Sequence, residues 1–111
     1  MKILVVDDDP SMRAFAAEAL SEEGYTVHTA PDGRTALQAV EEERPDAVVS
    51  DAVMPGIDGW ALAARLRMRP RPIPVVLMSA YTVIPSAPSV RVLAKPFELD
   101  DLFGAVAEAL G

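Results

Sequence analysis

Short apolar runs of strand length alternate with helix-like stretches along the whole 111-residue chain. The clearest runs cover residues 3–6, 46–50, 75–78 and 90–94, and residues 25–30 form a more polar one. This alternation is typical of βα units around a parallel sheet, because a helix must carry the chain back before the next parallel strand begins. Five units fit, so we predict an α/β fold in one domain over residues 1–111, with the polar run as an edge strand.

Local start and stop signals delimit the helices between these strands. Asp9 is a candidate N-cap followed by Pro10, and Gly24 ends the first helix. The second helix ends before Pro45, and the third begins at Asp58-Gly59. Apolar residues keep helical spacing in the first helix (Met12, Phe15, Ala16, Ala19 and Leu20), and Trp60, Leu62, Ala63 and Leu66 belong to the third. The predicted inner faces are Ala36, Leu37 and Val40 in the second helix, and Leu99, Leu102, Phe103, Val106 and Leu110 in the last.

The connection between the fourth and fifth strands is unusually short. Only residues 80–89 lie between Ser79 and Val90, and they include Pro85 and Pro88. A parallel crossover with its helix needs roughly 10–12 residues at minimum. We therefore predict a fourth helix of a turn or two, or an irregular segment.

Polar residues stand where the predicted strands end. Asp7 and Asp8 follow the first strand, Asp51 the third, Ser79 the fourth and Lys95 the fifth. The carboxyl ends of neighbouring parallel strands share one crevice, where open α/β sheets bind ligands. Three carboxylates offer only oxygen ligands, which favours Mg²⁺, and a carboxylate can attack phosphorus to form an acyl phosphate. The set predicts a site for Mg²⁺ and a phosphoryl group, with Lys95 and Ser79 facing the phosphoryl oxygens.

Composition argues against several other functions. A net charge of −7 weighs against direct nucleic-acid binding, and the absence of cysteine removes disulfides and cysteine-based sites. No apolar run could span a bilayer and the start does not resemble a signal peptide, so we expect a cytoplasmic protein without membrane insertion. His28 is the single histidine and lies within the predicted edge strand, so we expect no catalytic role for it.

Four of the ten cations lie close together near the end of the third helix: Arg65, Arg67, Arg69 and Arg71. One interpretation is that they remain solvated and complement the negative end of the helix dipole. The other is a docking patch for an acidic partner. The sequence leaves both open.

Several of these segments, taken together, resemble the receiver domain of bacterial two-component response regulators. The matching segments are residues 2–8, Asp51 with Met54-Pro55 and Asp58-Gly59, Ser79-Ala80, and Lys95-Pro96-Phe97. They occur in the family's order and cover essentially the whole chain. The resemblance implies a (βα)₅ doubly wound parallel sheet of strand order 2-1-3-4-5, in a stand-alone, chemotaxis-regulator-like receiver.

The resemblance also implies a role for each matching residue. Asp51 is the phosphoacceptor for a sensor histidine kinase or a histidine phosphotransfer protein. Asp7, Asp8, Asp51 and the backbone carbonyl of Val53 hold Mg²⁺, while Ser79 and Lys95 contact the phosphoryl group. The Lys95-Pro96 bond is expected to be cis. The protein would be a signalling domain rather than an enzyme, with at most self-phosphorylation from small donors and autodephosphorylation, and would act on an unidentified downstream protein.

Two departures from the family leave an alternative open. The family usually carries an aromatic residue three places before the lysine, where this chain has Val92, and the fourth unit is short. A receiver-fold interaction module with phosphate-independent output is therefore the second hypothesis.

A more remote hypothesis is a phosphatase of the haloacid-dehalogenase type. It is suggested by Asp7-x-Asp9-x-Ser11, Ser79, Lys95 and the Asp100-Asp101 pair. The chain is short for that fold with its cap, and Asp100-Asp101 is predicted to begin a helix rather than end a strand.

Overall fold

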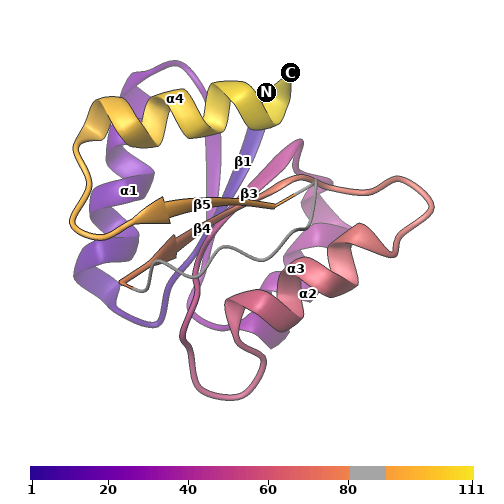
Figure 1. Cartoon of the computed structure of the whole chain (residues 1–111). Coiled ribbons are helices and arrows are strands. Elements are labelled where there is room, and N and C mark those ends of the chain that lie inside the picture. Colours follow the sequence, from indigo (N-terminus) through magenta and orange to yellow (C-terminus); the bar gives the residue numbers. More distant parts are fainter. Residues whose placement is uncertain (81–89) are drawn as a thin grey trace.

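The computed structural model describes residues 1–80 and 90–111 and contains one five-stranded parallel sheet (Figure 1). The strand order is β2-β1-β3-β4-β5, which confirms the predicted α/β architecture. The strands are β1 (Lys2–Val6), β2 (Thr26–Ala30), β3 (Ala47–Asp51), β4 (Val75–Ser79) and β5 (Val90–Ala94). The described residues form four helices: α1 (Pro10–Glu22), α2 (Gly33–Glu43), α3 (Gly59–Arg67) and α4 (Leu99–Leu110).

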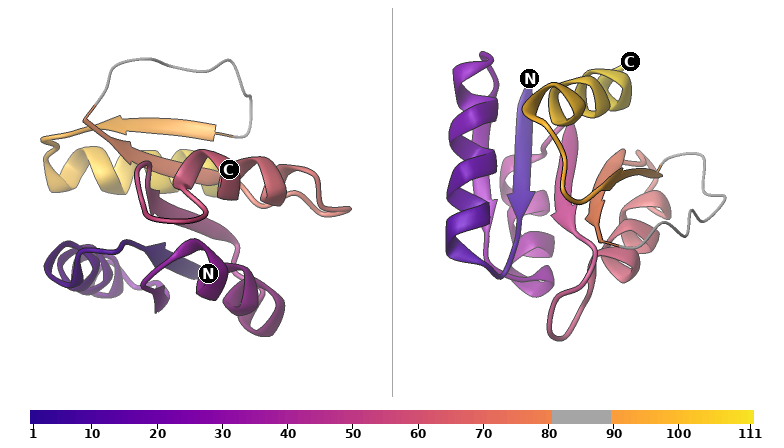
Figure 2. Two further views of the ribbon diagram at one scale, coloured as in Figure 1. Left: turned by 90° about the horizontal axis from the view of Figure 1, so that it is seen from below. Right: turned by 60° about the vertical axis from the view of Figure 1, so that its left-hand side comes forward.

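Helices cover both faces of the sheet (Figure 2). The side of α2 and α3 is packed by a cluster that includes Val40, Leu62 and Leu66, and the side of α1 and α4 by one that includes Leu20 and Leu102. Strands buried on both faces appear as continuous apolar runs, which explains why the central strands were the easiest to predict. The polar run became β2, which is an edge strand as predicted.

Aspartate caps begin three of the helices. The carboxylates of Asp9, Asp32 and Asp58 accept the backbone N–H groups of Ser11 at 2.9 Å, Thr35 at 2.7 Å and Ala61 at 2.8 Å. The structure thereby confirms the capping roles predicted for Asp9 and Asp58.

One predicted inner-face residue, Leu99, is wrong, and Phe15 faces solvent although it keeps helical spacing with its neighbours. Phe15 is 48% exposed and Leu99 is 37% exposed. Phe15 lies at the flank of the stripe formed by Ala16, Ala19 and Leu20, so α1 turns it toward solvent. Leu99 is the first residue of α4, where no preceding turn covers it.

The predicted short fourth helix, with Pro85 and Pro88, lies outside the described residues. Across residues 1–80 and 90–111, no helix combines the length and apolar character needed to cross a membrane.

Candidate functional site

The sheet brings the predicted site residues to one edge. Asp7 and Asp8 follow β1, Asp51 ends β3, Ser79 ends β4 and Lys95 follows β5. Two backbone hydrogen bonds tie these strand ends together: the Ala52 amide donates to the Met78 carbonyl at 2.9 Å, and the Lys95 amide to the Ser79 carbonyl at 2.7 Å. The peptide bond between Lys95 and Pro96 is cis, as the resemblance implied.

Three carboxylates and one ammonium group make up the centre of the site. One oxygen from each of Asp7, Asp8 and Asp51 lies within 4.8 Å of the others. The Lys95 Nζ atom lies 2.8 Å from Asp51 Oδ1. Two carboxylates about 4 Å apart repel by roughly 4 kcal/mol at an effective dielectric near 20. Since one ammonium cannot balance three carboxylates, the crevice carries excess negative charge.

Asp7 is the most constrained of the three acids. Its side chain is buried, and Oδ1 accepts the Asp9 amide at 3.0 Å. Oδ2 is also buried but has no hydrogen-bond partner among the described residues. Burial raises the pKa of Asp7 above its ordinary value, and the neighbouring Asp51 raises that pKa further. An unpartnered buried carboxylate oxygen is costly, so the donor set fits a hard cation such as Mg²⁺.

Val53 was also predicted as a ligand, through its carbonyl oxygen. It lies two residues beyond Asp51 in the loop after β3, and its side chain is 63% exposed. The position suits a backbone ligand, whose side chain need not face the site. The role of its carbonyl stays a prediction.

Two hydrogen bonds that the sequence did not predict hold the backbone of Asp7 and Asp51. Arg13 Nη1 donates to the Asp7 carbonyl at 2.8 Å, and Ser50 Oγ donates to the Asp51 carbonyl at 2.9 Å. Both fix the backbone of a site residue while leaving its carboxylate available. Nothing in the local pattern around Arg13 distinguishes it from a solvated helix residue.

Glycine lets the loop after β3 pack tightly against its surroundings. A Cβ atom on Gly59 would lie 2.2 Å from the Asp51 carbonyl oxygen, and one on Gly33 would lie 2.5 Å from the carbonyl oxygen of Ile57. The first turn of α3 therefore sits directly on the backbone of Asp51. The sequence indicated Gly59 as part of a helix start and of a segment that resembles the family, but not this contact with Asp51.

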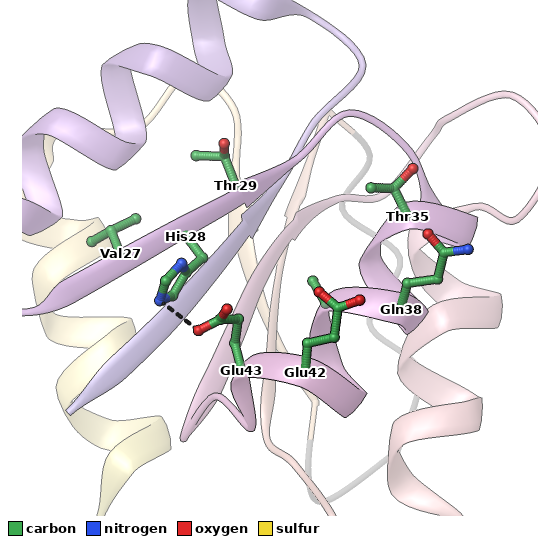
Figure 3. Close-up of a pocket in the computed structure, with 8 residues that line it drawn as sticks. Val27, His28, Thr29, Thr35, Gln38, Glu42 and Glu43 are labelled. Atoms are coloured by element: carbon green, nitrogen blue, oxygen red, sulfur yellow. Dashed lines mark ion pairs between the residues drawn. The ribbon is translucent and has the colours of Figure 1, made fainter.

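His28 belongs to a different part of the molecule. Residues of β2 and α2 line a cavity of about 470 Å³ (Figure 3), which contains none of the predicted site residues. There, His28 Nε2 lies 3.1 Å from Glu43 Oε2, and Lys2 Nζ lies 3.8 Å from the same oxygen. The contact joins the edge strand to α2.

The raised pKa of Asp7 predicts an unusual dependence of stability on pH. The pKa of Asp7 is near 4 in the unfolded protein and higher in the folded protein. Between these two pKa values the folded protein binds more protons than the unfolded protein. The free energy of unfolding therefore falls as the pH rises through this range. The pKa values of Asp32 and Glu41 are lowered, by the Thr35 amide and Arg69 respectively, so their stabilisation is lost as pH falls below about 4.

Asparagine does not titrate, so in metal-free buffer Asp7→Asn should lose this fall in unfolding free energy above about pH 4. The variant should therefore be more stable than the wild type at neutral pH. Urea unfolding at a series of pH values, with a chelator present, measures this. Parallel pH profiles for the variant and the wild type would contradict the prediction.

Fold and site together define a doubly wound α/β domain with an acidic cation site at the carboxyl edge of its sheet. The family model for the response regulator receiver domain matches residues 3–107. The chain therefore belongs to this family, whose members are two-component signalling domains that are phosphorylated on aspartate and bind Mg²⁺ at an acidic cluster.

Individual relatives agree with the family match. The chain is 44% identical over 109 residues to the transcriptional regulatory protein TcrA of Mycobacterium tuberculosis, covering 93% of this chain and 43% of TcrA. It is 36% identical over 115 residues to sporulation initiation phosphotransferase F of Bacillus subtilis, covering 98% of this chain and 93% of the Bacillus protein. The chain thus spans less than half of TcrA but nearly all of the Bacillus protein.

Solved structures show the same likeness. The receiver domain of the hybrid histidine kinase CckA has a TM-score of 0.86 at 35% identity, over 100% of both chains. The response regulator TrrA of Thermotoga maritima, solved in complex with Mg²⁺ and BeF, has a TM-score of 0.87 at 35% identity, over 98% of both chains.

Proposed function

We propose that this chain accepts a phosphoryl group on Asp51 from the phosphohistidine of a sensor histidine kinase or histidine phosphotransfer protein, in the cytoplasm. The observation that carries the proposal is the ion pair of Lys95 with Asp51, 2.8 Å long, beside the two carboxylates that follow β1. Asp51 alone among the three acids lies at the end of a central strand next to both β4 and the cation.

The transfer makes one bond and breaks one. An oxygen of the Asp51 carboxylate attacks phosphorus, the bond from phosphorus to the donor histidine nitrogen breaks, and the imidazole leaves with the bonding electron pair. The product is an acyl phosphate. Lys95 then exchanges its contact with Asp51 Oδ1 for one with the phosphoryl oxygens, and the Ser79 hydroxyl donates to another of them.

Asp7, Asp8, Asp51 and the Val53 carbonyl would hold Mg²⁺ in this proposal. Bound there, the cation would neutralise charge on the carboxylates and on the incoming phosphoryl group. The buried Asp7 Oδ2 atom, which has no hydrogen-bond partner among the described residues, supports this assignment. The bound Mg²⁺ and BeF of TrrA offer an analogy in a relative of the same fold.

Incubation with acetyl phosphate and Mg²⁺, followed by intact-mass measurement, tests the proposed function. One phosphoryl group per chain is expected with Mg²⁺ and none with a chelator present. Labelling that persists without divalent cations would contradict the Mg²⁺-dependent transfer.

Mg²⁺ affinity should depend on Asp8. Because the charge count of the ligands sets the affinity of oxygen sites, Asp8→Asn should weaken binding about tenfold or more. Trp60 is half-buried and follows Gly59, which packs on Asp51, so its fluorescence should report the titration.

The matched control for this titration is Asp9→Asn. It removes a neighbouring charge from a residue that caps α1, and asparagine caps about as well as aspartate. Equal binding curves for the wild type and Asp8→Asn would show that the metal assignment is wrong.

A phosphate-independent docking module is the second candidate, because Val92 lies where the family carries an aromatic residue. Val92 is half-buried in β5 opposite Leu77. A downstream partner that binds wild type, phosphorylated protein and Asp51→Asn equally well would favour this candidate. The phosphatase hypothesis is weakened, since Asp100 and Asp101 lie in the first turn of α4 rather than at a strand end.

A further inference from the structure

Charge is distributed very unevenly along the chain. Residues 59–97 contain six of the ten Lys and Arg residues and none of the seventeen Asp and Glu residues. The protein as a whole has a net charge of −7, so the rest of the chain is strongly acidic. A local basic region on an acidic protein creates a field that can orient a charged partner before contact.

Three of these six cations are already paired. Lys95 pairs with Asp51, and Arg69 forms an ion pair with Glu41. The Nε atom of Arg91 lies 3.4 Å from Oε2 of Glu108. Arg69 thus has an ion-pair partner on α2, which neither interpretation of the four arginines included. The remaining three, Arg65, Arg67 and Arg71, are exposed and form no ion pair within the described part of the chain.

An exposed apolar side chain stands among these arginines. Met68, the C-cap of α3, is 83% exposed, which is the highest value among the exposed large hydrophobic residues that the structure describes. Burying such a side chain fully is worth roughly 1.5–3 kcal/mol, so a partner that covers it gains more than charge contacts. We call Arg65, Arg67, Met68 and Arg71 the α3 basic patch.

The segment that carries the patch is held in place. The ion pair of Arg69 with Glu41 ties it to α2, and the Ile73 amide donates to the Leu66 carbonyl at 3.3 Å. Pro70 and Pro72 restrict the backbone between these contacts. This segment therefore loses less conformational entropy when a partner binds than a flexible loop would.

The α3 basic patch lies away from the phosphoacceptor. Helix α3 begins at Gly59 against Asp51 and runs back along the sheet, so Arg67 lies toward the amino ends of the strands. Figure 1 shows the loop after α3 extending from the side of the sheet opposite the strand tips. A partner bound there would leave the crevice around Asp51 open.

We propose that the α3 basic patch docks an acidic protein segment that carries an apolar side chain, independently of phosphate on Asp51. Three guanidinium groups without an ion-pair partner in residues 1–80 and 90–111 match carboxylates, and the exposed Met68 matches an aliphatic group. The exposed apolar side chain of Met68 favours such a peptide over nucleic acid, whose affinity is dominated by phosphate contacts.

A fluorescein-labelled peptide of glutamate and leucine residues, titrated against the full chain, tests the proposal by fluorescence anisotropy. We expect Arg67→Gln and Arg71→Gln each to weaken binding by about threefold, and the double variant by about tenfold. Met68→Ser should weaken binding at high salt, where charge contacts are screened. Wild-type protein phosphorylated with acetyl phosphate and Mg²⁺ should bind the peptide as tightly as unphosphorylated protein does.

Arg34→Gln is the matched control, because Arg34 lies on α2 outside the patch. Circular dichroism melting confirms that each variant folds. The proposal is overturned if Arg34→Gln weakens binding as much as Arg71→Gln, if a single-stranded oligonucleotide of equal charge binds as tightly as the peptide, or if no binding occurs at low salt. A dimer in sedimentation that Arg67→Gln abolishes would overturn it in favour of a second copy of the chain.

Discussion

Asp51→Asn should take up no phosphoryl group from acetyl phosphate or from a phosphorylated histidine donor. The amide nitrogen and oxygen of asparagine are too weakly nucleophilic to attack phosphorus, and the neutral side chain loses the charge that pairs with Lys95 2.8 Å away. Intact-mass measurement over a time course gives the result directly. We expect the loss to be complete within detection.

Asp9→Asn provides the comparison for this experiment. Asp9 lies in the same acidic segment but caps α1 through the Ser11 amide at 2.9 Å, so its replacement should leave labelling at the wild-type level. Loss of labelling in both variants would mean that total negative charge, rather than one nucleophile, governs uptake. Persistent labelling of Asp51→Asn would place the phosphoacceptor elsewhere and revive the phosphatase hypothesis.

Gly59→Ala should destabilise the fold by about 3 kcal/mol or more, at the upper end of the range for overpacked sites. The added Cβ would lie 2.2 Å from the Asp51 carbonyl oxygen and 2.9 Å from Ala52 Cα. Both are backbone atoms of the site, so neither can rotate away as a side chain could. Relieving the contact requires α3 or the end of β3 to move. Because Asp51 ends β3, phosphorylation of Asp51 should also become slower in this variant.

Gly104→Ala is the matched control for Gly59→Ala. Gly104 lies inside α4, and a Cβ atom added there would meet no described atom within 4 Å, so alanine should stabilise the helix by about 0.5–1 kcal/mol. Urea unfolding of both variants measures the difference. If the two substitutions have similar effects, the close packing of α3 on Asp51 is not a constraint on the fold.

The fold could be predicted because its signals in the sequence are local. Central strands such as β1 and β4 are buried on both faces, so each appears as an uninterrupted apolar run. Asp9 and Asp58 each cap the helix that follows immediately. Since parallel strands place their carboxyl ends together, the position of Asp51 near Lys95 followed from the strand pattern combined with the family resemblance.

What the sequence missed depends on distances between segments far apart in the chain. The contact of Gly33 with Ile57 exists only because α2 packs beside the loop after β3. Arg69, just beyond the end of α3, pairs with Glu41 on α2, although the neighbouring Arg67 and Arg71 form no ion pair with any residue that the structure describes. Phe15 had the right spacing for an inner face but lies outside the arc that the sheet covers.

The most direct test of the central claim is to locate the phosphoryl group in the wild-type protein. After incubation with acetyl phosphate and Mg²⁺, borohydride reduction converts an acyl phosphate on aspartate into homoserine, which survives proteolysis and peptide sequencing by mass spectrometry. We predict homoserine at position 51 alone. Homoserine at position 7 or 8, or none anywhere after full uptake of phosphate, would contradict Asp51 as the phosphoacceptor.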